Sequence, residues 1–251
     1  MSRTARPTHF DRSTLVRRLA GLAAPSRKIP PAVAIGTQLG EWIDFNDAMT
    51  LFAALHDSKA VVVSGVPDVG VAGDLGVLLA CERAAMTEAI HAGIRPGART
   101  RIKWPALVAS ETPLEIAADF AAYHRYYQAH QREMDVRVGT LRAAVRNTIT
   151  ARVPSLRQLT ALDAAFDKVL GPRERDLLAQ VPFLLEKRFV QLRESRPAEA
   201  QDTIAAWMQP RGWLATFARD MQGVLMAELE MRLQPIIGLI ATLSNKEARQ
   251  E

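Results

Sequence analysis

The chain has little cysteine and histidine and no long apolar run. One cysteine and five histidines occur among 251 residues, which excludes a disulfide framework and a multi-cysteine zinc site. Cys81 stands in an apolar stretch, so we expect a buried small side chain rather than a reactive thiol. No apolar run reaches the roughly 18 residues of a membrane-spanning helix. The apolar stretch near the N-terminus is too short for a secretory signal. We therefore expect a cytoplasmic chain whose contact with a membrane, if any, is made through a partner.

Positive charge is concentrated at the N-terminus. The formal net charge is +5, but residues 1–28 hold seven basic residues and one acid, so the remaining sequence is slightly acidic. The basic isoelectric point therefore describes a tail more than the body of the protein. It is not by itself an argument for nucleic-acid binding.

The hydrophobic residues, 48% of the chain, have helical periodicity almost throughout. We expect an all-α fold, an elongated antiparallel helical bundle with long coiled-coil-like helices and a smaller N-terminal helical part. Three parts are predicted: a basic flexible tail with a short amphipathic helix (1–30), an N-terminal helical subdomain (31–105) and the long-helix bundle (106–251).

The longest predicted helix runs from Thr112 to Val153. It begins with a capping box in which Pro113 takes the first helical position, and it stops before Pro154. Its apolar seam follows heptad spacing with one stutter, which indicates coiled-coil packing. The seam consists of Ile116, Phe120, Tyr123, Tyr127, His130, Met134, Val138, Leu141, Val145 and Thr148.

Shorter helices are predicted on both sides of the long one. The amphipathic segment 13–24 would dock on a partner, on acidic lipid or back on its own domain. Residues 35–56 form a helical stretch with Asp44 as an interruption or an internal cap. Later helices are expected over 155–170, 172–194, 200–207 and 212–243, with a break at Gly171 and Pro172, a bend at Pro182 and a kink near Pro235.

The passage from Ala60 to Gly73 is strand-like and rich in glycine. A strand, a glycine loop and a helix follow one another in nucleotide-binding units, but these glycines match neither G-x-G-x-x-G nor G-x-x-x-x-G-K-[ST]. Val71 and Ala72 stand where the lysine and the hydroxyl that hold phosphate and magnesium would be. We interpret the passage as a loop between helices.

No set of residues forms a catalytic or metal-binding motif. Glu88 and His91 have the Glu-x-x-His spacing of a di-iron helix, but the second pair occurs only in reversed order, at His130 and Glu133. His130 lies on the apolar seam, which favours a hydrogen-bonded core residue. No serine or cysteine stands in a nucleophile elbow. We expect no enzymatic activity, no catalytic residue, no metal and no cofactor.

Two stretches without acids are rich in basic residues. They lie between Glu88 and Glu111, beside Trp104, and between Asp135 and Asp163. At about 100° per residue, four arginines of the long helix fall broadly opposite the seam, and we expect them to be exposed. Such a face contacts nucleic-acid phosphates or a protein partner, or it is solvated and paired with acids. The candidate contact residues are Arg95, Arg99, Arg101, Lys103, Arg125, Arg132, Arg142 and Arg146.

Four segments of the sequence can be compared with known families: LVRRLAGLA, GEWIDFNDAMTLFAAL, LDAAFDKVLGPRERDLLAQVPFLLEKRF and FARDMQGVLMAELEMRLQPIIGLIATL. They resemble an uncharacterised family common in beta-proteobacteria, a domain of unknown function. Members of that family are encoded beside MotA/TolQ-type proton-channel proteins and OmpA-type peptidoglycan-binding proteins. That gene set resembles the third type of the Zorya anti-phage defence system, with this family as the accessory ZorF. The resemblance implies a cytoplasmic component that works with a membrane motor, and it supplies no catalytic residue.

Two functions from different classes follow as expectations. The first is a non-enzymatic scaffold or interaction protein of a motor-linked defence complex, with protein partners and a homo-oligomer as a further candidate assembly. The alternative is a nucleic-acid-binding module that uses the arginine-rich helical face.

Overall fold

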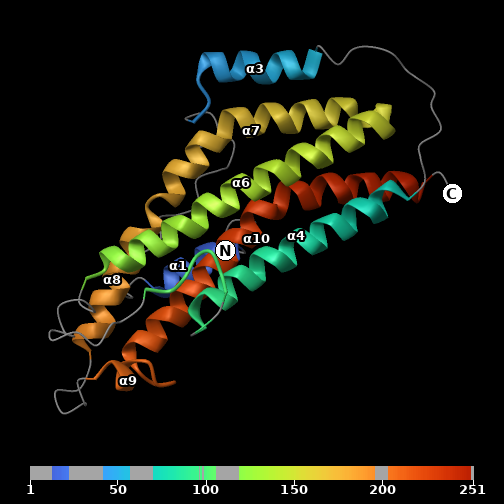
Figure 1. The fold of residues 1–251 in the computed structure, drawn as a ribbon. Coiled ribbons are helices and arrows are strands. Elements are labelled where there is room, and N and C mark those ends of the chain that lie inside the picture. Colours follow the sequence, from blue (N-terminus) through green and yellow to red (C-terminus); the bar gives the residue numbers. More distant parts are fainter. Residues whose placement is uncertain are drawn as a thin grey trace, which may run out of the picture. The chain divides into compact units, whose positions relative to one another are not determined.

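The computed structural model describes residues 13–22, 42–56, 70–95, 97, 99–105, 119–195 and 203–249. Every regular element in these ranges is a helix, so the predicted all-α fold is confirmed (Figure 1). Contacts divide the chain into two compact units, and three helices contribute residues to both. They are α4 (Val71–Ile94), α6 (Ala121–Arg152) and α10 (Trp213–Glu247). The three-part organisation expected from the sequence stays a prediction.

The first unit has an aromatic core. It comprises residues 1–29, 85–135 and 180–231, and it includes α1 (Thr14–Leu22), α8 (Val181–Glu194) and α9 (Ile204–Trp207). The rings of Tyr123, Phe189 and Phe217 meet at centroid distances of 5.0 to 5.6 Å, mostly tilted or edge to face. This geometry adds to the free energy of burial because ring edges and faces carry opposite partial charges.

The amphipathic N-terminal helix docks on its own chain. Helix α1 packs against α8, and Leu15 is buried while Leu19 and Leu22 are half-buried. Of the three predicted destinations of this helix, the structure therefore shows the third, a return to its own domain.

The second unit is formed by residues 30–84, 136–179 and 232–251. It contains α3 (Phe45–His56), the short 3-10 helix η2 (Pro154–Leu156) and α7 (Arg157–Leu178), together with parts of α4, α6 and α10. Helices α6 and α7 form an antiparallel hairpin through η2. The hydroxyls of Thr150 and Thr160 meet across it at 2.8 Å. Helix α3 packs against α7.

The long helix α6 is shorter than predicted. It begins at Ala121, whose N–H donates to Oδ1 of Asp119 at 2.8 Å, a side-chain cap that satisfies one of the orphan N–H groups of the first turn. The predicted capping box at Thr112 lies outside the described residues. The predicted end is confirmed, since α6 stops at Arg152 and Pro154 opens η2.

The apolar seam of α6 is buried as predicted over most of its length. Its residues from Phe120 to Val145 are buried. At the end Thr148 is only half-buried, and its neighbour Ile149 is fully buried instead. The 3.6-residue period of the helix accounts for this drift away from a strict heptad.

The helix break predicted at Gly171 and Pro172 is wrong. Helix α7 continues through both residues to Leu178. Pro172 removes the N–H that would bond the Lys168 carbonyl, but Pro172 and Lys168 are both exposed, so water can bond that carbonyl. The chain breaks instead at Ala179 and Gln180, and Pro182 lies in the first turn of α8, where a proline costs no hydrogen bond.

Candidate interaction surface

Helix α3 begins with a reciprocal cap, which confirms the prediction of an internal cap at Asp44. The N–H of Asp47 donates to Oδ1 of Asp44 at 2.8 Å, and the N–H of Asp44 donates to Oδ2 of Asp47 at 3.3 Å. Two orphan N–H groups are thereby satisfied, and the acids interact favourably with the positive end of the helix dipole. The start of α3 is thus fixed by its own sequence.

The far end of α3 is tied to α7. The amide of Gln158, in the first turn of α7, donates to the Leu55 carbonyl at 3.2 Å. The rings of Phe52 and His56 stack at a centroid distance of 3.8 Å. Since one of the last carbonyls of α3 is bound by a side chain of α7, the helix is held against α7 at this end.

Helix α3 turns its more apolar face away from α7. The residues that are half-buried include Asp47, Thr50, Leu51 and Ala54, at helical spacing. No residue of α3 is fully buried. The opposite face, which we call the α3 apolar face, is exposed by 79% at Phe45, 51% at Met49, 53% at Phe52 and 43% at Leu55.

The α3 apolar face is an unusual feature for a surface helix. A surface helix normally points its apolar stripe at the core, and full burial of one such side chain contributes about 1.5 to 3 kcal/mol. Four large apolar side chains side by side leave most of that free energy unrealised. Contiguous exposed apolar patches of this kind mark interaction sites.

The predicted basic cluster around Trp104 lies in a loop that packs against the first unit through Trp104. The N–H of Trp104 donates to the Gly93 carbonyl at 2.8 Å, and the indole lies 5.0 Å from the Tyr123 ring and 5.2 Å from the Tyr126 ring. A Cβ on Gly93 would come within 2.5 Å of the Tyr126 hydroxyl. Glycine at this position therefore allows the loop and α6 to approach closely.

Two of the four candidate cations in this loop are paired. Arg95 forms an ion pair with Glu88, and Arg101 forms one with Glu133 on α6. Arg99 and Lys103 are exposed, and neither makes an ion pair with the described part of the chain.

The four candidate arginines of α6 do not form one surface. Arg125 and Arg132 are exposed, as predicted, and pair with no described acid. Arg142 and Arg146 are only 13% and 17% exposed, so the prediction that they are exposed is wrong. At about 100° per residue they lie on the flank of the seam, where α7 packs.

The acids of α7 explain this burial. Asp163 and Asp167, one turn apart, each bind both Arg142 and Arg146 at 2.7 to 3.0 Å. The sequence contains the pattern that predicts this network: two arginines and two aspartates, each four residues apart, equidistant from the turn of a helical hairpin. These two arginines hold α6 and α7 in register and are not available for phosphate.

His130 is a core residue, as predicted, but the hydrogen bond expected for it is not found among the described residues. It is 2% exposed and its ring meets the Tyr126 ring at 4.7 Å. Burial lowers the pKa of His130 from 6.5 to about 4, so the imidazole is neutral at pH 7. Its Nε2 has no hydrogen-bond partner among the described residues, and the same holds for the buried hydroxyls of Tyr123 and Tyr126.

A buried carboxylate was missed by the sequence analysis. Glu228 of α10 is fully buried, accepts the Tyr127 hydroxyl at 2.6 Å and is also bound by the Gln131 amide at 3.2 and 3.3 Å. Glu228 follows Leu225 at helical spacing and precedes Leu229, both on the apolar stripe of α10. Its position within the apolar stripe is the feature of the sequence that could have predicted the burial of Glu228.

The described residues contain no cluster of three or more histidine, cysteine, aspartate or glutamate side chains that could hold a metal ion. Of the Glu-x-x-His pair, Glu88 binds Arg95, and Nδ1 of His91 lies 2.8 Å from the amide nitrogen of Gln222. Cys81 is exposed, so the prediction of a buried residue is wrong. It lies on the solvent side of α4, whose exposed side chains also include Val77 and Leu78.

Comparison with known proteins places the chain in a family. A family model described as "Protein of unknown function (DUF3348)" matches residues 1–245. The chain belongs to the DUF3348 family. The DUF3348 match covers all of the helices described above except the last residues of α10. No curated protein and no solved structure gives a significant match. None of the described helices combines the length and the apolar character that crossing a lipid bilayer requires.

Proposed function

We propose that this protein is a non-enzymatic helical scaffold that binds a protein partner through the α3 apolar face. The observation that carries the proposal is the exposure of Phe45, Met49, Phe52 and Leu55 on one side of a capped and anchored helix. Aromatic residues and methionine are the types enriched at protein interfaces, and charged residues are depleted from interface centres.

The partner we propose is a component of a membrane-motor-linked anti-phage defence system, with MotA/TolQ-like and OmpA-like proteins. Support for it comes from the resemblance of four segments to the ZorF accessory of type III Zorya systems. Within this proposal the protein is cytoplasmic and reaches the membrane through the motor protein. Because the α3 apolar face is hydrophobic, we expect the partner to bind it with an apolar helix or groove.

The long apolar seam is not the surface we propose for assembly. In the first unit, Tyr123 of the seam packs against Phe217 of α10 at 5.6 Å, and Tyr127 is bound to Glu228. Because the seam is filled by the chain itself, a homo-oligomer would need another surface.

Co-purification tests this function. The full chain is expressed together with the MotA/TolQ-like and OmpA-like proteins of the proposed defence system. The mass of any complex is measured by size-exclusion chromatography with light scattering. A stable complex with the motor protein supports the proposal. A protein that elutes as a monomer and co-purifies with neither of the two proteins contradicts the proposal.

Nucleic-acid binding remains a second candidate function, supported by a specific observation. Arg99, Lys103, Arg125 and Arg132 are exposed cations of the first unit, and none of them is paired with a described acid. The discriminating variants are Arg125→Glu and Arg132→Glu, because Arg142 and Arg146 are committed to ion pairs. DNA retention is measured across a salt series, and a flat response excludes phosphate contact.

A further inference from the structure

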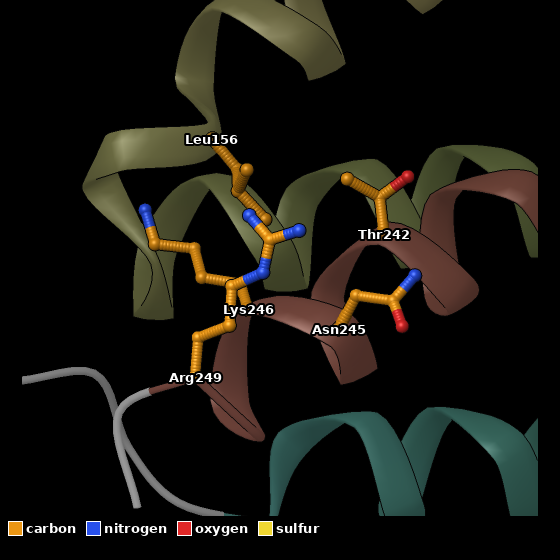
Figure 2. A pocket seen from close by; sticks show the side chains of 5 residues that line it. All are labelled: Leu156, Thr242, Asn245, Lys246 and Arg249. Atoms are coloured by element: carbon orange, nitrogen blue, oxygen red, sulfur yellow. The ribbon is translucent and has the colours of Figure 1, made fainter.

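A hollow lies at the C-terminal end of α10 in the second unit. Its volume is about 540 Å³, and it is lined by Leu156, Thr242, Asn245, Lys246 and Arg249. Figure 2 shows the Arg249 guanidinium extending toward Leu156, with the Asn245 and Thr242 side chains beside it on α10. Helix α10 thus contributes three polar side chains to one wall, Arg249 follows just after the helix ends, and η2 contributes an apolar side chain.

The hollow carries positive charge that its lining residues do not neutralise. Lys246 and Arg249 are both cationic, and none of the described residues that line the hollow is an acid. The nearby Glu247 is engaged elsewhere, because its Oε1 accepts the Ala72 N–H in the first turn of α4 at 3.2 Å. The Arg249 guanidinium makes no hydrogen bond or ion pair with any described residue.

The negative end of the α10 dipole neutralises only part of the charge of Lys246 and Arg249. Cations in a last helical turn complement a dipole equivalent to roughly half a negative charge. The charges of Lys246 and Arg249 together exceed that half charge, so the described lining of the hollow has a net positive charge. The Lys246 ammonium is also fixed at the rim, since it donates to the Ser155 hydroxyl.

The polar lining consists mainly of donors. An ammonium and a guanidinium have no acceptor atom, and the amide of Asn245 adds two N–H groups. The Thr242 hydroxyl already donates to the Gly238 carbonyl at 2.9 Å. Such a set of donors matches an anion, and a guanidinium binds the oxygens of a phosphate in bidentate fashion.

The size of the hollow and its apolar wall favour an organic anion over a free inorganic ion. A volume of about 540 Å³ falls within the range of sites for organic ligands and exceeds what a free phosphate ion fills. Leu156 and the aliphatic stems of Lys246 and Arg249 offer apolar contact. We infer that this hollow binds a small organic phosphate, with the phosphate at Lys246 and Arg249 and the organic body against Leu156. The inference is independent of the proposed function, because it concerns other residues and a different kind of ligand.

Titration of the full chain tests the inference. Inorganic phosphate, adenosine monophosphate and adenosine are titrated separately at low ionic strength, with isothermal calorimetry as the readout. We expect adenosine monophosphate to bind more tightly than inorganic phosphate and adenosine to show no binding. Arg249→Gln and Lys246→Gln should each weaken the binding of adenosine monophosphate about tenfold or more, because each removes a charged hydrogen-bond donor.

The matched control is Arg219→Gln. Arg219 is an exposed arginine of α10, and among the described residues its side chain bonds only the Thr216 hydroxyl, at 3.1 Å. It should leave the affinity unchanged. An equal loss in Arg219→Gln would show general charge attraction and overturn the site. Unchanged affinity in both Arg249→Gln and Lys246→Gln would overturn it as well. Equal affinities for inorganic phosphate and adenosine monophosphate would overturn the assignment to an organic phosphate.

Discussion

Arg142 of α6 and Asp163 of α7 form a two-point ion pair. Nε of Arg142 lies 2.9 Å from Oδ2 of Asp163, and Nη2 lies 2.7 Å from Oδ1. Burial acts to lower the pKa of Arg142, but the hydrogen bond to Asp163 and the charges of Asp163, Asp167 and Glu174 raise that pKa above its ordinary value. Arg142 therefore stays charged and serves the fold rather than a ligand.

We expect Asp163→Asn to lower the free energy of unfolding by about 2 to 3 kcal/mol. The substitution leaves Asp167 as the one acid of the network that still forms ion pairs with the two partly buried arginines, and uncompensated buried charge is strongly destabilising. Urea denaturation followed by circular dichroism measures the loss. Arg125→Gln, on the exposed side of the same helix, should change stability by less than about 0.5 kcal/mol. Equal stability of Asp163→Asn and the wild type would contradict the structural role of the network.

Two adjacent tyrosines provide a matched pair of variants. Tyr127→Phe removes the 2.6 Å hydroxyl donor of the buried Glu228 carboxylate, and we expect a loss of about 1.5 to 3 kcal/mol of stability. Tyr126→Phe removes a buried hydroxyl that has no partner among the described residues. Its cost should be near zero, since no hydrogen bond is lost. A greater loss for Tyr126→Phe than for Tyr127→Phe would contradict this assignment.

His130 predicts a pH-dependent stability. Its pKa in the folded state is about 4, below the ordinary 6.5, so the unfolded chain binds the proton first as the pH falls. The contribution of His130 to stability should therefore be unchanged above pH 6.5 and should decline between pH 6.5 and 4, by a total of about 3 kcal/mol. Denaturation of the wild type and His130→Leu at pH 7.5, 6.5, 5.5 and 4.5 measures it, and the variant should have the shallower slope. Parallel slopes would refute the role of this imidazole.

The sequence predicted well those features that depend on local pattern. The cap at Asp44 follows from side-chain chemistry, and the burial of the α6 seam follows from helical periodicity. The end of α6 before Pro154 follows from the steric restriction that proline imposes on the preceding residue.

Features that depend on packing were predicted poorly. Pro172 was expected to end a helix, yet α7 continues through it, because its exposed position lets water bond the Lys168 carbonyl that the proline leaves free. Arg142 and Arg146 were expected in solvent, because a helical wheel for one helix does not include the acids of its neighbour. The outward orientation of Phe45 and Phe52 also depends on which face α7 covers, which the pattern of α3 does not contain.

Affinity for the partner, measured with two aspartate variants of α3, tests the central claim most directly. Phe52→Asp places a charge in the α3 apolar face, while Asn46→Asp adds the same charge at an exposed position beside it. Both variants should keep the circular dichroism spectrum and stability of the wild type, because both positions are exposed. We predict that Phe52→Asp weakens binding of the MotA/TolQ-like motor protein by at least about tenfold and that Asn46→Asp does not, since hot-spot residues at interface centres contribute about 2 kcal/mol or more. Binding of equal affinity by the wild type, Phe52→Asp and Asn46→Asp would contradict the account.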